Sequence, residues 1–335
     1  MSVAGGFTEH RDNLGGLGRM IAARAAIIAA TTVLVSFIMF GLAALSPFDP
    51  LASYLGTGYA ELSPAERADV AAAIGADQSW WRQWLDWFTG VFTGDLGFSR
   101  SYGRPVADVL SERLPWTILL SATGMTIAVA MAVALGTWAG RRPGGVVDKA
   151  VVALGVFIGA TPSFIYALGV VLIFAVTLNV IPAGGASPIG EQPSLFSIGP
   201  YLIAPALVLA VTQLPWPLLA VRQATVEAIG SDAVENALVR GVPRTVVLRR
   251  HIAPMSLMPL VTLVGGRLSE LVVGAVIVEA VFSWPGLAEA TVESAKAVDF
   301  PLLAATTVLT TVLVMGGSLV ADVTYKLLDP RVRDV

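Results

Sequence analysis

Two apolar runs of the chain flank a segment that reads Ser231-Asp232-Ala233-Val234-Glu235-Asn236-Ala237-Leu238-Val239-Arg240-Gly241-Val242-Pro243-Arg244 and continues to Arg249-Arg250-His251. A bilayer tolerates neither clustered charge nor lipid-exposed irregular backbone in its hydrocarbon layer. A segment with this many arginines is therefore expected at the cytoplasmic surface of a membrane protein, where a soluble partner can reach it. We call residues 231–254 the polar segment, and the cytoplasmic loop that carries it is predicted over residues 223–251.

The composition is that of an integral membrane protein. Of 335 residues, 55% are hydrophobic and 13% are charged, and the mean hydropathy is +0.75. A soluble domain of this composition would expose large apolar surfaces to water. The chain has no cysteine, and its histidines are His10 and His251 alone, so disulfides, thiolate catalysis and metal sites built from Cys or His are not expected.

Six segments are predicted to cross the membrane, which makes the fold class all-α. Five are uncharged runs of at least ~20 residues, the length that spans a hydrocarbon core of about 30 Å, and a sixth is interrupted by charged residues. The first run exceeds the roughly 7–15 apolar residues of a signal peptide and is expected to stay as an anchor. The predicted spans are residues 25–45, 114–140, 150–181, 200–221, 252–281 and 300–321.

The distribution of lysine and arginine predicts the orientation. With both termini inside, 14 of the 21 basic residues fall in cytoplasmic segments, and most of the others lie in one long outer loop, which the positive-inside rule weights lightly. The expected organisation is a cytoplasmic segment at 1–24, the first span at 25–45, an extracytoplasmic loop with short helices at 46–113 and a core at 114–335.

The outer loop contains signals for helices. Ser63-Pro64-Ala65-Glu66 is a capping box and Gly75 is a stop signal, so a helix is predicted near residues 64–74. A stripe of aromatic residues then recurs at helical spacing, with Trp81 beside it: Trp80, Trp84, Trp87 and Phe88. The stripe fits a helix at the outer membrane interface or one packed on the transmembrane bundle, and both alternatives stay open.

Prolines interrupt the third and fourth predicted spans, at Pro162, Pro205, Pro215 and Pro217. Each proline removes a backbone donor, so kinks or breaks are expected there, either as tolerated irregularities or as hinges.

Within the polar segment the residues predict a helix, a sharp turn and a second helix. Asp232 and Glu235 form an acidic capping box for a helix that runs to about Arg240. Gly241 is expected to end this helix in a left-handed conformation, and Pro243 to start the next. On local features alone, an ordinary loop with topogenic arginines explains the segment equally well.

Several motifs together resemble one family. The pattern Glu235-x-Ala237-x-x-x-Gly241, with Pro254 thirteen residues after the glycine, is similar to the EAA loop of permease subunits in bacterial binding-protein-dependent ABC importers. Further motifs resemble the oligopeptide, dipeptide and nickel branch, and the resemblance covers nearly the whole chain. These motifs are residues 94–99, 112–115, 278–287 and 327–333.

The resemblance implies a type I importer permease in the bacterial cytoplasmic membrane, whose polar segment docks on a cytoplasmic ATPase. Ala233 and Asn236 depart from the tyrosine and threonine common in this branch, and Glu235 stands where it often has arginine. The residues expected to couple to the ATPase are Asp232, Glu235, Asn236, Ala237, Arg240, Gly241, Pro243 and Arg244. The residues expected to face an extracytoplasmic binding protein are Trp84, Asp95 and Trp284.

The resemblance also implies the partners: a second permease, usually a different chain, two ATPase subunits or a fused pair, and the binding protein. ATP and Mg²⁺ would bind to the ATPases, and this chain is expected to hold no cofactor and to be no enzyme. Its lysines, Lys149, Lys296 and Lys326, follow Asp, Ala and Tyr, so none belongs to a Gly-Lys-Ser/Thr phosphate loop.

Peptides are the leading cargo. Nickel chelates, opines, haem and sugars stay open as alternatives, because the binding protein does most of the selecting in such systems. A self-sufficient secondary transporter or channel is the alternative from a different class of protein.

Arg267 and Glu270 lie in the fifth predicted span, where a charge is costly unless it is paired or hydrated. Three residues apart, they share a helical face and can pair locally. They are expected either to line the translocation path or to form a structural ion pair. Glu279, farther along the same helix, is expected near the outer interface as a hydrated carboxylate.

Overall fold

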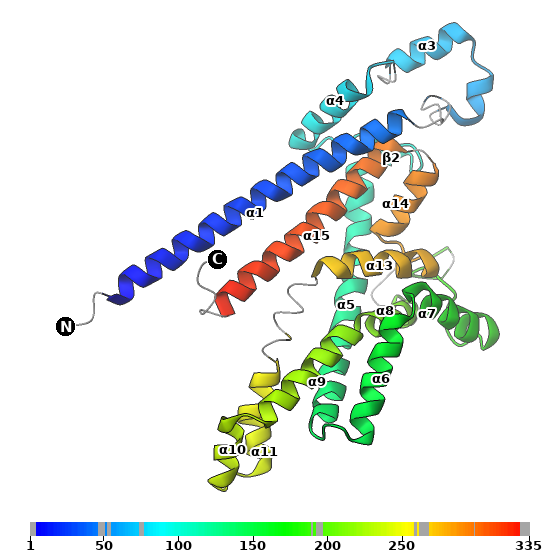
Figure 1. Cartoon of the computed structure of the whole chain (residues 1–335). Coiled ribbons are helices and arrows are strands. Elements are labelled where there is room, and N and C mark those ends of the chain that lie inside the picture. Colours follow the sequence, from blue (N-terminus) through cyan, green and yellow to red (C-terminus); the bar gives the residue numbers. More distant parts are fainter. Residues whose placement is uncertain are drawn as a thin grey trace. The chain divides into compact units, whose positions relative to one another are not determined.

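Among the residues it describes, the computed structural model is helical, with one short two-stranded hairpin and irregular connections between the elements (Figure 1). It divides into two units, and each is described by itself: residues 1–117 with 285–315 form the first, and residues 118–284 with 316–335 form the second. The residues that the structure describes are 5–45, 51, 55–73, 77–188, 190–191, 197–257, 260, 268–297 and 299–328.

The first unit joins a long N-terminal helix to the shorter elements that follow it in the chain. Two further helices, α5 and α15, each begin in this unit and end in the second. The elements are α1 (Gly5–Ala44), η1 (Gly56–Ala60), α3 (Pro64–Ala73), α4 (Trp80–Thr93), β1 (Phe98–Ser99), β2 (Arg104–Pro105), α5 (Val106–Gly140), α14 (Leu287–Lys296) and α15 (Phe300–Leu328).

The second unit contains the remaining helices, of which η2 and η3 are π-helical. The elements are α6 (Val146–Ala160), α7 (Ser163–Val170), η2 (Val171–Thr177), α8 (Gly199–Gln213), α9 (Pro215–Ile229), α10 (Asp232–Val239), α11 (Arg244–Val247), η3 (Leu248–Ile252) and α13 (Leu268–Phe282).

The helical membrane class is confirmed. Within the described residues, three helices are long and apolar enough to cross a membrane: Leu17–Leu42, Val106–Gly140 and Phe300–Val320. Three bent helix pairs pass the same test if each pair is counted as one broken span. The total of six spans and the cytoplasmic position of both termini therefore stay predictions.

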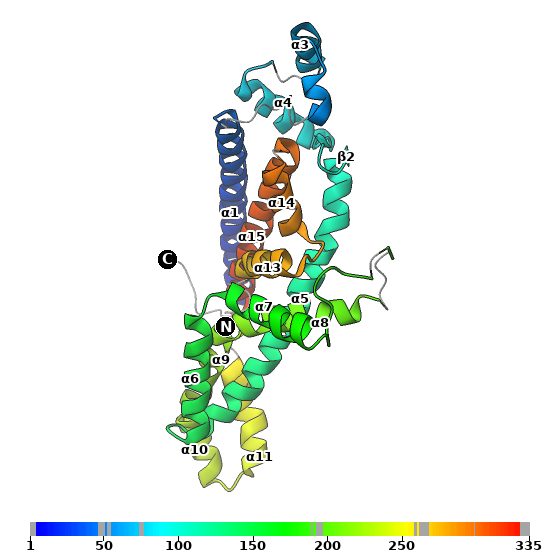
Figure 2. The same ribbon diagram turned by 90° about the vertical axis from the view of Figure 1, so that its right-hand side faces the viewer.

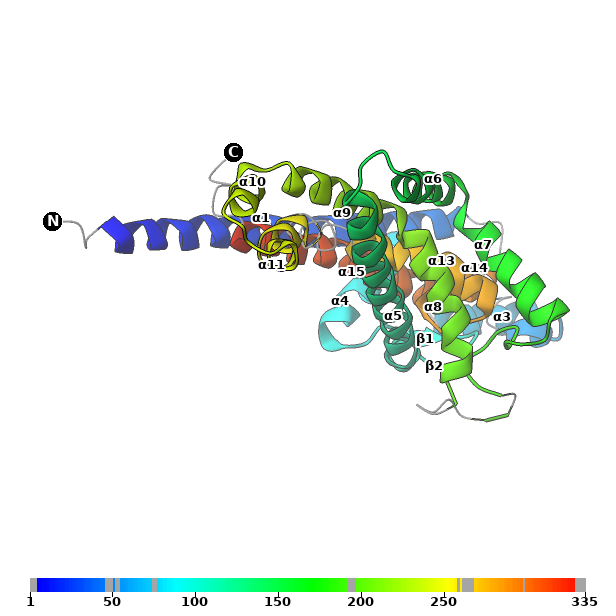
Figure 3. The same ribbon diagram turned by 90° about the horizontal axis from the view of Figure 1, so that it is seen from below.

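Two of the prolines break their helices as expected. Pro162 lies between α6 and α7, and the helix formed by α7 and η2 is bent from α6 by 96°. Pro215 is the first residue of α9, which is bent from α8 by 51° (Figure 3). Pro205 lies inside α8 without ending it. The difference is positional, because Pro215 supplies the first residue of a new helix, where a missing N–H costs nothing.

The predicted capping box at the start of α3 is confirmed. The backbone N–H of Ser63 donates to Glu66 Oε2 at 2.8 Å, and the N–H of Glu66 donates to Ser63 Oγ at 3.3 Å. The Ser63 hydroxyl also donates to Glu66 Oε2 at 2.7 Å, and this bond, followed by the one from the Ser63 N–H, lowers the pKa of the Glu66 carboxyl below its usual value. The helix ends at Ala73, and Gly75 lies outside the described residues.

The tryptophan stripe of α4 packs on α1, which decides between the two alternatives for that face. The ring centroids of Trp80 and Trp84 lie 4.9 and 5.1 Å from that of Phe37, and Trp84 Nε1 donates to Ser36 Oγ at 3.1 Å. Trp87 lies 5.6 Å from Phe40. Figure 2 shows α4 beside the end of α1.

The orientation can be tested with single cysteines, because the chain has none of its own. Thr57→Cys is expected to react with an impermeant thiol reagent in intact cells, and Arg244→Cys is not, because the charge distribution places residue 57 outside and residue 244 inside. The measurement is gel-shift labelling before and after lysis. Labelling at residue 244 but not at residue 57 in intact cells would reverse the predicted orientation.

Candidate functional site

The polar segment begins at the junction between α9 and α10 (Figures 1 and 3). Gly230 ends α9, and Ser231 is the only extended residue before α10. Its carbonyl accepts the N–H groups of Val234 and Glu235 at 3.0 and 3.1 Å. Ser231 is therefore the N-cap, and the prediction that Asp232 fills this position was wrong by one residue.

The acidic residues of the predicted capping box lie inside the first turn of α10 instead. Asp232 and Glu235 are exposed there. The Ser231 hydroxyl turns back and donates to the carbonyl of Ala228 at 2.7 Å. Negative charge at a helix N-terminus is still favourable, because the helix dipole places partial positive charge there.

The turn after α10 has the predicted left-handed glycine. Gly241 has φ of 77°, and its N–H donates to the carbonyl of Leu238 at 2.9 Å. The N–H of Val242 donates to the carbonyl of Ala237 at 3.1 Å. This pair of bonds is a Schellman motif, which satisfies carbonyls that the end of α10 would leave free. Arg240 is the C-cap, and Pro243 caps the start of α11.

The helix, turn and second helix enclose a small apolar core of their own. Val234 and Ala237 of α10 pack with Val247 of α11 and Ile252 of η3, and all four are buried. Ala228 of α9 belongs to the same cluster. Figure 3 shows α10 and α11 together at the end of α9. The polar segment is thus a compact folded element and not an extended loop.

Most other residues of the segment face solvent. Asn236, Arg240 and Arg244 are exposed, and so are the apolar side chains Leu238 and Val239, at 44% and 82%. Two large apolar residues at the exposed end of a charged helix are a feature of surfaces that meet another protein.

A groove of about 420 Å³ runs along the segment. Leu238 and Val247 contribute to its apolar lining, and Arg141 and Arg244 bring positive charge. Arg244 thus stands both at the start of α11 and at the groove. Concave apolar walls with a few charged groups are the form that receives a partner's side chains.

An ion pair that the sequence analysis did not predict joins α9, the helix that precedes the polar segment, to α6. Arg222 of α9 donates from Nε and one terminal nitrogen to the two carboxylate oxygens of Asp148 in α6, both at 2.7 Å. The N–H of Gly144 donates to the same carboxylate at 2.8 Å. Asp148 is only 3% exposed. Such bidentate bonds are short and directional, so they hold the two helices in one orientation.

Glycines bring α5 into direct contact with the same part of α9. A Cβ atom added at Gly140 would lie 2.6 Å from Thr225 Cβ and 2.8 Å from the carbonyl oxygen of Arg222. At Gly136 it would lie 2.9 Å from the carbonyl oxygen of Leu218. No side chain fits at these distances, so the end of α5 packs directly against α9. The start of α6 contacts α9 as well, through the ion pair of Asp148 with Arg222.

The predicted outer contact residues fall in different environments. Trp84 packs on α1, and Asp95 is exposed, with its carboxylate accepting the N–H of Gly97 at 2.9 Å. Trp284 is fully buried, which does not fit a contact with a binding protein. Glu279 is also fully buried, so the expectation of a hydrated carboxylate was wrong. The sequence predicted that Glu279 lies near the end of a helix, but its burial depends on the residues that pack around it.

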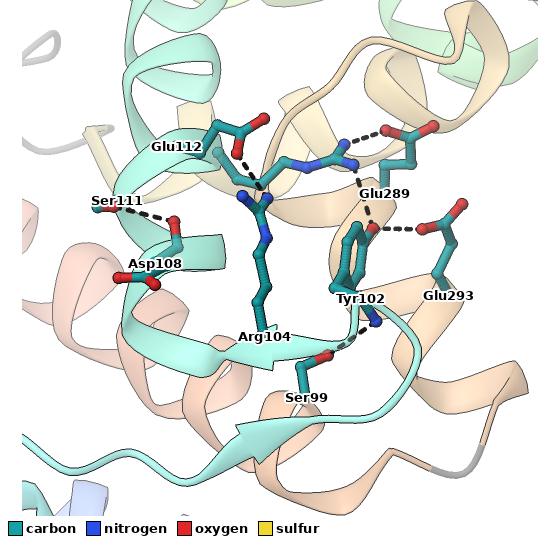
Figure 4. Close-up of polar contacts among 9 residues, drawn as sticks. Ser99, Tyr102, Arg104, Asp108, Ser111, Glu112, Glu289 and Glu293 are labelled. Carbon is teal, nitrogen blue, oxygen red and sulfur yellow. Dashed lines mark hydrogen bonds and ion pairs between the residues drawn. The ribbon is translucent and has the colours of Figure 1, made fainter.

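A polar network holds the short hairpin to α14 within the first unit (Figure 4). The Tyr102 hydroxyl donates to Glu293, and Arg113 donates to Glu289 and, at 3.2 Å, to the Tyr102 oxygen. Burial, followed by the bond to Glu293, raises the pKa of Tyr102. This network, together with the bonds from the hydroxyls of Ser99 and Ser101 to the Asp299 carboxylate, fixes the hairpin in place within the first unit.

The predicted path residues cannot be placed. Arg267 lies outside the described residues, and Glu270 lies in α13, but its side chain is outside the description. Among the described residues, no group of three His, Asp or Glu side chains could hold a metal ion.

Comparison with known proteins finds one family. Residues 132–334 match the binding-protein-dependent transport system inner membrane component. The oligopeptide transport system permease protein AppB of Bacillus subtilis is 30% identical over 300 residues, which cover 89% of this chain and 94% of that protein. The dipeptide transport system permease protein DppB of Escherichia coli is 25% identical over 336 residues, covering 94% and 98%. DppB of Lactococcus lactis is 29% identical over 274 residues, covering 82% and 87%.

Proposed function

The chain belongs to the family of binding-protein-dependent transport system inner membrane components, and from this premise we propose that it is a peptide permease subunit of an ATP-driven importer. Two relatives that match over most of their length are permeases for oligopeptides and dipeptides. Peptides are therefore the proposed cargo. The chain would form half of a translocation path, with a second permease as the other half.

The observation that carries the proposal is the fold of the polar segment. α10 and α11 close on their own apolar core and are joined by a Schellman turn, while Leu238, Val239 and the charged residues of α10 stay exposed. A folded element with an exposed apolar end can transmit force from a partner, because it moves as one body. We assign docking on a cytoplasmic ATPase to this element, with Asp232, Glu235 and Arg240 at the contact.

The path of the motion would run through α9. Gly230 alone separates α9 from the N-cap of α10, so a displacement of α10 pulls on α9. The Asp148–Arg222 pair and the contacts of Gly136 and Gly140 then carry that displacement to α6 and α5. Packed helices shift as units because close-packed interfaces deform little.

The remaining partners follow from the proposal. Two ATPase subunits, or one fused pair, would bind ATP and Mg²⁺, and an extracytoplasmic binding protein would deliver the peptide. The chain itself would hold no cofactor and catalyse no reaction.

Reconstitution tests the proposal. The chain is co-expressed with candidate permease and ATPase partner subunits, purified and placed in liposomes with a binding protein and labelled dipeptides or oligopeptides. Uptake is expected to require ATP and every subunit. Uptake by this chain alone on an ion gradient would instead establish a secondary transporter. ATP-dependent uptake of a nickel chelate or haem but of no peptide would keep the importer and overturn the cargo.

A further inference from the structure

The helix α4 carries an apolar stripe that its packing on α1 does not use. Trp81, Leu85 and Phe92 are 47%, 45% and 78% exposed. At about 3.6 residues per turn, these three residues and Phe88 fall within roughly 60° of one another around the helix axis. The residues that contact α1, such as Trp84, lie on the adjacent face.

The third face of α4 is polar. It lies on the side of the helix opposite the face that packs on α1, next to the exposed aromatic stripe. Its residues are Arg82, Gln83, Asp86, Thr89 and Thr93. Around its axis, α4 therefore has three faces in succession: one that packs on α1, one that is aromatic and exposed, and one that is polar. A helix that lies in a lipid–water interface needs this arrangement, because one side meets acyl chains and another meets water.

We infer that the exposed aromatic face of α4, formed by Trp81, Leu85 and Phe92, binds the outer lipid–water interface of the membrane. The contact with α1 sets the depth. α4 touches Phe37 and Phe40, and a Cβ at Gly41 would lie 3.8 Å from the Trp80 ring. These residues form the last turns of the span Leu17–Leu42. α4 thus lies where that span leaves the hydrocarbon.

The α1 span on which α4 packs also has exposed apolar side chains. Only 11% of the most apolar stretch of the α1 span is buried. Leu34, Ile38 and Leu42 of this helix are 57%, 47% and 57% exposed. Indole rings prefer the headgroup level, where one edge is apolar and the other is wet. The Arg82 guanidinium lies 5.3 Å from the centre of the Trp81 ring, so a cation accompanies the stripe at the level of lipid phosphates.

The anchored helix is tied to the hairpin. Trp87 Nε1 donates to the carbonyl of Leu96 at 3.2 Å. The hydroxyls of Ser99 and Ser101 each donate to the buried carboxylate of Asp299 at 2.7 Å. A membrane contact at α4 would therefore hold the hairpin and its network in Figure 4 at a fixed height above the lipid. This inference does not depend on which solute the protein carries.

Nitroxide labels on single cysteines test the inference in the full-length chain reconstituted in liposomes. Leu85→Cys and Phe92→Cys report on the proposed lipid face, and Asp86→Cys and Thr89→Cys on the polar face of the same helix. Collision rates with oxygen, which concentrates in lipid, and with a water-soluble nickel chelate are measured by electron paramagnetic resonance. The oxygen-to-nickel ratio is expected to be several-fold higher at residues 85 and 92.

Equal ratios on the two faces, with free access of the nickel chelate at residues 85 and 92, would overturn the inference. The inference would also be overturned if the nickel chelate reached both labels freely and the addition of a soluble binding protein then blocked its access. The face would in that case be a protein docking surface. An oxygen-rich signal that is unchanged by the binding protein supports the lipid contact. Native-like circular dichroism of each labelled variant ensures that a misfolded chain is not scored.

Discussion

A Gly241→Val variant is expected to reach the membrane and assemble with its partner subunits, yet to lose most of its peptide transport. Gly241 has φ of 77°, a conformation that costs a residue with a Cβ roughly 1–2 kcal/mol. A β-branched side chain is among the least tolerant of it. No neighbouring atom lies within 4 Å of a Cβ added there, so the effect is on the backbone and not through a clash.

The strain would shift the turn away from its native geometry. A cost of one or two kcal/mol changes the ratio of two states by about 5–30-fold. The Schellman bonds from Gly241 and Val242 to carbonyls of α10 fix the turn that leads to α11, so a distorted turn moves the exposed end of α10 relative to the rest of the segment. Transport and binding-protein-stimulated ATP hydrolysis are expected to fall together, while basal hydrolysis by the ATPases changes less.

Two variants serve as controls for this prediction. Gly241→Asn is expected to keep most transport, because asparagine tolerates the left-handed region. Gly230→Ala, at the other end of α10, is expected to be nearly silent, since Gly230 has φ of −81° and an added Cβ meets its nearest atoms at 3.8 Å. Normal transport by Gly241→Val in a well-assembled complex would contradict the coupling assignment.

An Arg222→Met variant is expected to give a much lower yield of folded protein. It removes two bonds to Asp148 and leaves only the N–H of Gly144 on a carboxylate that is 3% exposed. Breaking one side of a fully buried ion pair costs roughly 3–5 kcal/mol. Here we expect less than that, because the Arg222 side chain is 22% exposed and water can partly replace it.

The double variant Asp148→Asn with Arg222→Met is expected to recover much of the yield. The amide oxygen of asparagine still accepts the Gly144 N–H, and no charge is left unpaired. Arg249→Met is the matched control, since it removes an exposed arginine from η3. The measurements are monodisperse yield after detergent extraction and the thermal midpoint of each variant. Equal yields for Arg222→Met and Arg249→Met would show that the pair is not a brace.

The same double variant separates folding from coupling. If the pair only stabilises the fold, the recovered protein should transport as well as the parent. If the pair also transmits motion from α10 to α6, the recovered protein should hydrolyse ATP with less peptide moved per ATP, because the brace between α9 and α6 is weaker.

Features that depend on near neighbours in the chain were predicted from the sequence. The capping box at Ser63 and Glu66, the break at Pro162 and the left-handed turn at Gly241 all appear in the structure. Each depends on atoms within a few residues, so the residue types suffice to specify it. The N-cap of α10 was misplaced by one residue, at Asp232 in place of Ser231, because the end of α9 sets that boundary.

Composition and local pattern alone determined that this chain is a helical membrane protein and predicted the turn at Gly241, because hydropathy and turn chemistry are properties of short stretches of sequence. They left open whether the polar segment is folded, and its buried apolar core is a finding of the tertiary structure. Only the tertiary structure paired Asp148 with Arg222, 74 residues apart, and decided that one face of α4 packs on α1. It also buried Glu279 and Trp284, whose positions in the sequence suggested exposure. Pairing and burial depend on which helices meet, and the free energy of those contacts comes from residues far apart in the chain.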